Sequence, residues 1–235
     1  MNADSLVLGL LWYAVFLFST TCHEAAHALA AKLGGDLTAF HSGQVTIDPL
    51  PHIRREPFGM VIMPILSFVL GGWMMGWASA PYDPHWASRH PHRAAWMSLA
   101  GPGANLTLVF VAALGIHAGL WLKVFHLPDS ANFTRVIAAN GAGVPDAFAT
   151  LLSVLFSLNL LLFSFNLLPI PPLDGFSVAG LLMSEDRARR LEEFGHSNRM
   201  FALAGLMLGW RLFGVLYNPI FTFGLRLLYP WTTYG

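Results

Sequence analysis

Long apolar stretches constrain the fold of this 235-residue chain more than any other feature of its sequence. A helix needs about 20 apolar residues to cross the hydrocarbon core of a bilayer. Four tracts reach that length with few charges: Leu6 to Ala31, Phe58 to Ala78, Ala94 to Leu122 and Ala147 to Leu168. A fifth apolar tract, Met200 to Tyr229, is interrupted by Arg211, Asn218-Pro219 and Arg226. We therefore expect an all-α polytopic membrane protein with about four to six membrane segments.

The tracts leave little of the chain for anything else, so we expect one membrane-embedded domain over residues 1–235. The motifs described below lie between residues 6 and 185, and residues 200–229 add one segment or two short ones. No internal repeat and no polar block of domain size is present. The first tract has neither a basic n-region nor a small-residue cleavage site, so we do not expect a removable signal peptide.

Charge and cysteine content exclude several classes of protein. Only 11% of the residues are charged, against about 25% in a soluble domain, and 13 basic residues balance 13 acidic ones. The chain thus lacks the broad basic surface of a nucleic-acid-binding protein, and we expect no nucleic-acid partner. The single cysteine, Cys22, excludes an intramolecular disulfide and cysteine-rich zinc modules. A metal site must use histidines and carboxylates.

The first apolar tract contains a His-Glu-x-x-His run, formed by His23, Glu24 and His27. Residues four apart lie above one another on a helix, so the two imidazoles can bind one metal ion. Glu24 is rotated by about 100 degrees from His23 along a helix with 3.6 residues per turn, which suits a general base rather than a ligand. Ionisable side chains are costly within a bilayer and mark functional sites there.

A catalytic zinc usually has three protein ligands, so a third must come from elsewhere in the chain. Asp174 is the best candidate, because it directly follows an apolar tract and lies in a proline-rich segment that cannot continue as a helix. An ordinary turn at the end of a membrane span is the alternative interpretation of that segment. Because His23 and His27 supply only two ligands and a third is needed, coordination by Asp174 is the favoured interpretation.

Three motifs in this order resemble the site-2 protease family (M50) of intramembrane zinc metalloproteases. They are His23-Glu24-x-x-His27, Gly101-Pro102-x-Ala104-Asn105, and Asn166-x-x-Pro169-x-Pro171-Pro172-Leu173-Asp174-Gly175. The resemblance extends from about residue 6 to about residue 185 and is closest to the smaller members, which lack PDZ and CBS domains. It implies hydrolysis of peptide bonds within or near transmembrane segments of membrane proteins.

The resemblance also implies roles for individual residues. His23, His27 and Asp174 match the ligands of one Zn²⁺, and Glu24 matches the base that activates water. Asn166 matches a residue that holds the substrate carbonyl or oxyanion, although a helix-packing amide is the alternative. Five further motif residues are expected to bind substrate or support the structure: Gly101, Pro102, Asn105, Pro171 and Gly175. For Asn105 the two roles have equal weight.

The zinc hypothesis makes a prediction about topology. His27 lies near the end of its tract and Asp174 follows its own, so both reach one ion only if the two segments run in the same direction. An odd number of crossings must then separate them, although two long tracts intervene. Pro64 and Gly71-Gly72 make Phe58 to Ala78 the expected re-entrant segment.

This topology places most basic residues at one end of the membrane domain. The active-site end would hold Lys32, Arg54, Arg55, Arg89, Arg93, Arg187, Arg189, Arg190 and Arg199, and the opposite loop only Lys123 and Arg135. Basic residues are enriched on the cytoplasmic side of membrane proteins. We therefore expect a multi-pass protein of a prokaryotic inner membrane, with its active site towards the cytoplasm. Its partners would be the lipid bilayer and transmembrane substrates, and a homo-oligomer remains open.

The polar connections carry further expectations. Thr38 to Asp48, with β-branched residues and a Ser42-Gly43 turn signal, predicts a small β-hairpin whose edge is available to an extended substrate. Tyr82 to His92 is expected to be an interfacial loop in which His85, His90 and His92 are solvated rather than metal ligands. Met183 to Arg199 is expected to be a solvated surface helix or loop.

Two other functions were weighed against the protease. One is a catalytically silent relative that binds membrane proteins, but every motif residue that the chemistry needs is intact. The other is an ion-conducting transporter that uses histidine and aspartate as an ion path. It would show an inverted repeat, which the sequence lacks, and would not require a glutamate beside paired histidines.

Overall fold

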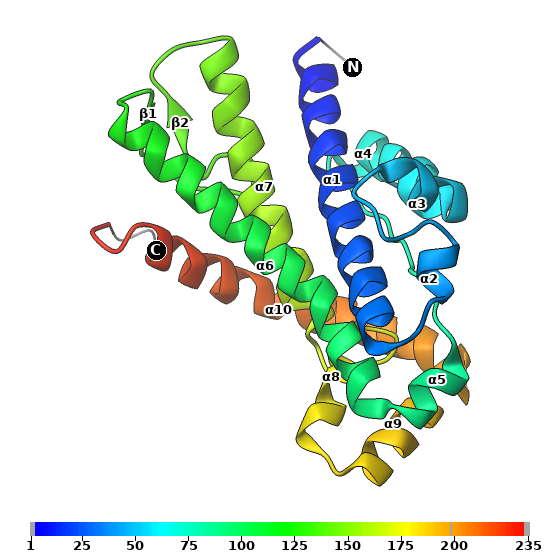
Figure 1. Ribbon diagram of the computed structural model, residues 1–235. Helices are drawn as coiled ribbons and strands as arrows, with labels where there is room; N and C mark the ends of the chain where they lie inside the picture. The colour runs from blue at the N-terminus through cyan, green and yellow to red at the C-terminus, as the bar shows by residue number, and fades with distance from the viewer. Residues whose placement is uncertain (1–2, 198, 233–235) are drawn as a thin grey trace.

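The computed structural model describes residues 3–197 and 199–232, and it consists almost entirely of helices (Figure 1). Three long helices form its centre: α1 (Ala3–Gly34), α6 (Pro91–Trp121) and α7 (Val144–Asn166). Within the described residues, these three are long and apolar enough to cross a membrane. The all-α membrane fold predicted from the sequence is confirmed.

Helix α6 packs against both α1 and α7 and runs in the opposite direction to them (Figure 1). The C-terminal ends of α1 and α7 therefore meet the N-terminal end of α6 at the same end of the bundle. Val15, Val109 and Val154, one from each helix, are buried in the main hydrophobic core. One antiparallel crossing between two parallel helices is the arrangement that the zinc hypothesis requires.

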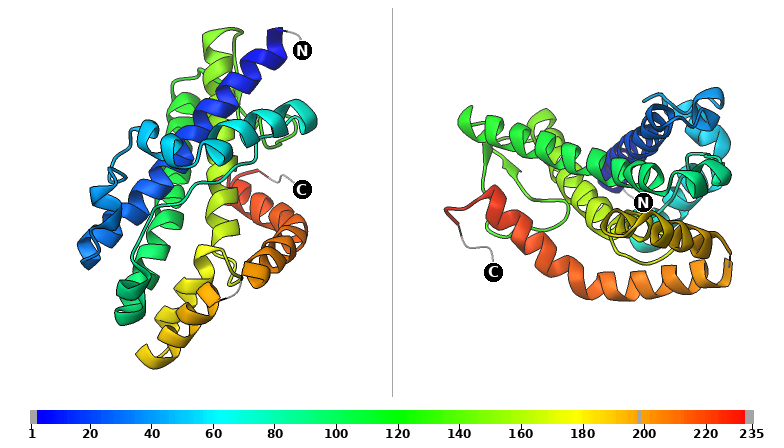
Figure 2. Two further views of the ribbon diagram at one scale, coloured as in Figure 1. Left: turned by 90° about the vertical axis from the view of Figure 1, so that its right-hand side faces the viewer. Right: turned by 60° about the horizontal axis from the view of Figure 1, so that its bottom comes forward.

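Shorter elements surround this bundle. They are α2 (Thr38–His41), α3 (Pro49–Arg55), η1 (Phe58–Ile62), α4 (Met63–Gly71), α5 (Pro84–Arg89), α8 (Asp174–Val178), η2 (Ala179–Leu182), α9 (Glu185–Ser197) and α10 (Arg199–Leu228). The C-terminal tract, expected to give one segment or two, forms the single helix α10. Figure 2 shows α10 on the side of α7 that faces away from α1.

The second apolar tract turns back to its starting point. Its helical part, Phe58–Gly71, would be about 21 Å long at 1.5 Å per residue, which is too short for a bilayer core of about 30 Å. The chain then returns in an extended form, and Ser79 meets the start of the tract. The Ser79 carbonyl accepts a hydrogen bond from Arg55 Nε at 2.9 Å, and Ser79 Oγ donates to Glu56 Oε1 at 2.7 Å. This closed excursion is the form expected of a re-entrant segment.

The predicted position of the β-hairpin was wrong. Residues 38–48 form α2 and a series of turns, and the two-stranded antiparallel sheet lies instead between α6 and α7, in β1 (Phe125–His126) and β2 (Ala138–Ala139). Local hydrogen bonds from side chains to the backbone override the strand preference of the β-branched residues here. Asp36 Oδ1 accepts hydrogen bonds from the backbone N and the hydroxyl of Thr38, and Asp48 caps α3 by accepting from Leu50 N. No edge for a substrate strand exists at residues 38–48.

The connections at the active-site end are more ordered than predicted. Residues 84–89 form α5, and Trp86 of that helix is buried and donates to the carbonyl of Gly34 at the end of α1. Helix α9 lies at the surface, as predicted, but one of its faces is buried and carries Ala188 and Glu192. Its Glu193 accepts a hydrogen bond from Ser88 Oγ at 3.1 Å. Helices α5 and α9 thus cover the end of the bundle where α1 and α7 meet.

Candidate metal centre

The first part of the site is a single turn of α1. His23, Glu24 and His27 are all buried, with exposed fractions of 7%, 5% and 8%. The Nε2 atoms of the two histidines lie 3.0 Å apart, because residues four apart overlie one another on the helix. One potential ligand atom from each of the three side chains lies within 4.8 Å of the other two. The His-Glu-x-x-His run therefore forms the compact cluster that its spacing predicts.

Asp174 reaches this cluster from the far side of the bundle. Helix α7 ends at Asn166, and the proline-rich segment that follows directs the chain back so that Asp174 begins α8. Asp174 Oδ2 lies 3.2 Å from Nε2 of His23, and Oδ1 lies 3.3 Å from Nε2 of His27. The structure thus brings together the three side chains that the sequence proposed as ligands.

The convergent atoms have the spacing that zinc requires. Ligand atoms about 2.0–2.1 Å from a tetrahedral zinc lie about 3.3–3.4 Å from one another. The three separations among His23, His27 and Asp174 are 3.0, 3.2 and 3.3 Å. Two imidazoles and one carboxylate are also a common donor set of catalytic zinc sites, which keep a further position open. The residues therefore fit a zinc ion both in chemistry and in spacing.

Helix α6 fixes the orientation of both imidazoles. His27 Nδ1 donates to the backbone carbonyl of Met97 at 2.8 Å, and His23 Nδ1 donates to Asn105 Oδ1 at 2.6 Å. With its proton on Nδ1, each ring leaves the lone pair of Nε2 for a metal ion. Asn105 is fully buried and occupied by this contact, which favours the structural role over contact with a substrate.

Close approach between α6 and α1 depends on Gly101. A methyl group added there would overlap Nε2 of His27 and would lie 2.6 Å from Nε2 of His23. Pro102 follows within the helix and lacks the N–H that would bond to the Ser98 carbonyl, which loosens the turn that faces the histidines. Gly101 is thus part of the wall of the site, and Pro102 is buried next to it in the helix.

The proline-rich segment is held by similar close contacts. A methyl group at Gly175 would overlap the carbonyl oxygen of Leu167, so the glycine lets α8 fold back against the end of α7. The carbonyl of Pro171 packs against Gly205 of α10 with equally little space. Asn166 is half-buried at the end of α7, and among the described residues no hydrogen bond joins it to His23, His27 or Asp174. Its role towards a substrate stays a prediction.

Charges around Asp174 favour its ionised form. Burial alone would raise the pKa of this carboxyl, but His27 and His23, which contact its oxygens, hold the pKa below its usual range. A ligand must be deprotonated to bind metal. Burial also raises the pKa of Tyr82, and the negative charges of Glu192 and Asp174 add to that effect. Tyr82 therefore stays neutral beside the site.

Sequence reasoning missed several residues that support the site. Ser177, one turn after Asp174, donates from Oγ to Glu192 Oε2 at 2.9 Å and so ties α8 to α9. Asn159 on α7 and Ser19 on α1 are fully buried and form a hydrogen-bond chain with Asn105. A signal for Asn159 was present in the sequence, because an amide in the middle of an uncharged apolar span requires a partner.

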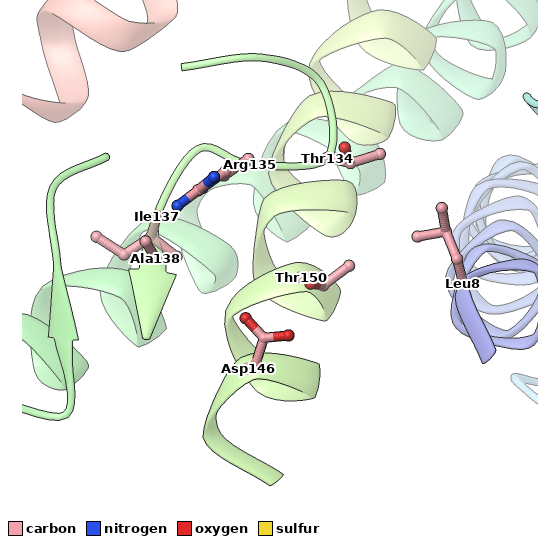
Figure 3. Close-up of a pocket in the computed structure, with 7 residues that line it drawn as sticks. All are labelled: Leu8, Thr134, Arg135, Ile137, Ala138, Asp146 and Thr150. Carbon is pink, nitrogen blue, oxygen red and sulfur yellow. The ribbon is translucent and has the colours of Figure 1, made fainter. Parts of the chain in front are cut away.

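Other candidate sites do not form. His92 Nε2 bonds to the carbonyl of Met183, and within the described part of the chain the only group suited to a metal is that of His23, Glu24 and His27. Figure 3 shows a pocket at the other end of α7, where Arg135 and Asp146 are among the lining residues. None of the residues proposed from the sequence lines it.

Comparison with known proteins decides the family. The sequence profile of peptidase family M50 matches residues 12–209, a range that contains the paired histidines, Glu24 and Asp174. The chain belongs to peptidase family M50. The family and the three apolar helices together support a multi-pass membrane protein with protease activity.

Relatives with assigned names are bacterial. A Bacillus subtilis (strain 168) protein named "Putative zinc metalloprotease YwhC" is 34% identical over 174 residues, which are 73% of this chain and 69% of the relative. A Mycolicibacterium smegmatis protein named "Putative zinc metalloprotease Rip2" is 30% identical over 76% of this chain and 59% of the relative. A Mycobacterium tuberculosis (strain Erdman) protein of the same name is 30% identical over 87% of this chain and 70% of the relative. The chain thus spans less than two thirds of the M. smegmatis protein. No solved structure matches the chain.

Proposed function

We propose that this M50 protein is an intramembrane zinc metalloprotease that hydrolyses peptide bonds within or near transmembrane segments of other proteins. One observation carries the proposal: Nε2 of His23, Nε2 of His27 and the Asp174 carboxylate converge at zinc-like spacing, although Asp174 follows a different apolar helix. Names given to the bacterial relatives agree with zinc-dependent proteolysis.

In this proposal His23, His27 and Asp174 hold one zinc ion. Bound zinc acts as a Lewis acid, which polarises a carbonyl and lowers the pKa of water. Glu24 is buried on the same helical turn but is not needed as a ligand, so its carboxylate is free to accept a proton from the attacking water. The same carboxyl then returns the proton to the departing amine.

Asn166 is proposed to hold the substrate. Its side-chain amide, at the end of α7 and before the segment that carries Asp174, would donate a hydrogen bond to the substrate carbonyl and to the oxyanion that forms from it. A transmembrane substrate hides its carbonyls in helical hydrogen bonds, so the segment to be cleaved must first unwind.

The active site is proposed to lie towards the cytoplasm, since basic residues gather at that end of the bundle. Single cysteines that replace the exposed Arg54 and Arg89 should react with an impermeant thiol reagent only from the cytoplasmic side. A cysteine at the exposed Asp129 should react only from the other side. Cys22 is replaced by alanine in all three proteins. Labelling of positions 54 and 89 from opposite sides would contradict both the proposed orientation and the re-entrant segment.

Zinc removal tests the proposed activity. The purified protein in lipid vesicles is incubated with a panel of single-span transmembrane peptides, and products are identified by mass spectrometry. Cleavage within or near the apolar segment should be lost after treatment with a zinc chelator and should return when Zn²⁺ is added, because apo protein lacks the Lewis acid.

Three outcomes would contradict the proposal. Cleavage that persists in protein shown to be free of zinc would assign hydrolysis to other residues. Zinc-loaded protein that binds the peptides without cleaving any of them would favour the catalytically silent relative. Zinc-dependent ion flux through the vesicles without cleavage would favour the transporter.

A further inference from the structure

A chain of buried amides links the candidate metal centre to the backbone of α7. Asn105 Oδ1 accepts from His23 Nδ1 at 2.6 Å, Asn105 Nδ2 donates to Asn159 Oδ1 at 2.8 Å, and Asn159 Nδ2 donates to the Leu155 carbonyl at 2.8 Å. We propose that Asn159 is a positioning residue that, through Asn105, fixes the proton of His23 on Nδ1 and so leaves Nε2 free to bind the metal.

The Leu155 carbonyl determines which way the Asn159 amide is oriented. A backbone carbonyl can only accept a hydrogen bond, so the Asn159 atom that lies 2.8 Å from it must be the NH₂ group. The same NH₂ group donates to Ser19 Oγ at 2.9 Å. The opposite amide orientation would place two oxygens against each other at a position buried from solvent. Asn159 Oδ1 must therefore face Asn105.

Each subsequent link follows from the previous one. Because Asn159 presents an oxygen, Asn105 must present its NH₂ group to it, and its own oxygen then faces His23. An oxygen at 2.6 Å from Nδ1 of the ring requires a proton on that nitrogen. All three polar partners, Asn105, Asn159 and Ser19, have exposed fractions of 0%, so no solvent molecule competes for these bonds.

The proton of His27 is also held on Nδ1, but by one direct hydrogen bond to the backbone. Its Nδ1 donates directly to the Met97 carbonyl of α6, which is an unambiguous acceptor. At His23 the partner is an amide, which presents either an acceptor or a donor depending on its rotation. Without Asn159, the Asn105 amide is free to rotate and donate to Nδ1. The proton of His23 would then move to Nε2, the atom that must bind the metal.

This inference rests on the proposed function, because it concerns a histidine that binds metal. The test is a titration of metal-free protein with Co²⁺, whose visible spectrum reports the number and type of ligands and requires no substrate. Asn159→Leu keeps the branched shape of the side chain and removes all three of its hydrogen bonds, to Asn105, Ser19 and the Leu155 carbonyl. Loss of an outer-shell partner typically lowers metal affinity by about 10–100-fold, and we expect that loss together with a changed Co²⁺ spectrum.

Four further variants separate positioning from helix packing. Asn105→Leu should cause a similar loss, and the double variant should bind no more weakly than either single one, because both act on His23 by one route. Asn159→Asp, kept protonated by burial, retains an oxygen for Asn105 and a hydroxyl donor for the Leu155 carbonyl, and should recover most of the affinity. Ser157→Ala, on the same helix and equally buried, removes a hydroxyl that has no hydrogen-bond partner in the described part of the chain, and this variant should bind as the wild type does.

The outcomes distinguish this inference from the proposed function. Wild-type protein that binds no Co²⁺ would overturn both. If the wild type binds Co²⁺ and Asn159→Leu binds it with equal affinity and spectrum, only the inference fails. Losses that multiply in the double variant would also overturn it, since they would show that Asn159 acts apart from Asn105. If Asn159→Leu does not fold, Asn159→Ala replaces it in both comparisons.

Discussion

Glu24→Gln should lower peptide hydrolysis by at least about 10²–10⁴-fold, the range attributed to general acid–base catalysis. Glutamine keeps the size of the side chain and its place on the α1 turn, but it does not accept a proton from water. Because the proposed ligands are His23, His27 and Asp174, zinc content should stay near that of the wild type. Cleavage rate and zinc per chain are measured on the same preparation.

Glu185→Gln is the matched control, because Glu185 is exposed at the start of α9 and should not affect cleavage. If Glu24→Gln hydrolyses peptides at the rate of the wild type, Glu24 is not the base. If it loses its zinc, Glu24 acts as a ligand, and the division of roles between Glu24 and Asp174 must be reversed.

Gly101→Ala should weaken zinc binding and abolish most activity. The added methyl group would overlap Nε2 of His27 and crowd that of His23, so either the rings or α6 must move. Displacement of catalytic groups by about 1 Å is enough to cost about 100-fold in rate. The helix itself gains, since alanine is the better helix former. Any loss would therefore come from the site rather than from the helix.

Gly103→Ala provides the control on the same helix, because, apart from its own turn of α6, no atom of the described residues lies within 4 Å of the position that its methyl group would occupy. This variant should bind zinc and cleave peptides as the wild type does. Equal zinc affinity in the two variants would contradict the account of Gly101 as a wall of the site.

The sequence was sufficient for the parts of the site that depend on helix geometry and topology. Spacing alone placed His23 above His27, and the need for Asp174 at the same depth predicted a re-entrant second tract. The first prediction follows from the periodicity of a helix, and the second follows from the direction in which successive helices cross the membrane. The return of Ser79 to Arg55 and Glu56 shows how the second tract closes.

Features that depend on side-chain partners were not predicted. Residues 38–48 contain strand-forming residues, yet the Asp36 carboxylate accepts a hydrogen bond from Thr38 N at the start of α2, and the Asp48 carboxylate caps α3. Glu192 belongs to a charged segment that looks solvated, but α9 buries it against Ser177. Asn159 acts through bonds to distant parts of the chain. In each case the deciding contact joins residues that sequence periodicity does not relate.

The central claim is that two histidines of α1 and the aspartate of α8 hold one zinc ion. Zinc per chain in purified protein tests it most directly, with the wild type beside His23→Ala and Asp174→Ala. We expect about one zinc in the wild type and loss of it in both variants, since two remaining ligands fall short of the three that catalytic zinc sites use. Zinc retained at the wild-type level in a folded Asp174→Ala variant would contradict the claim.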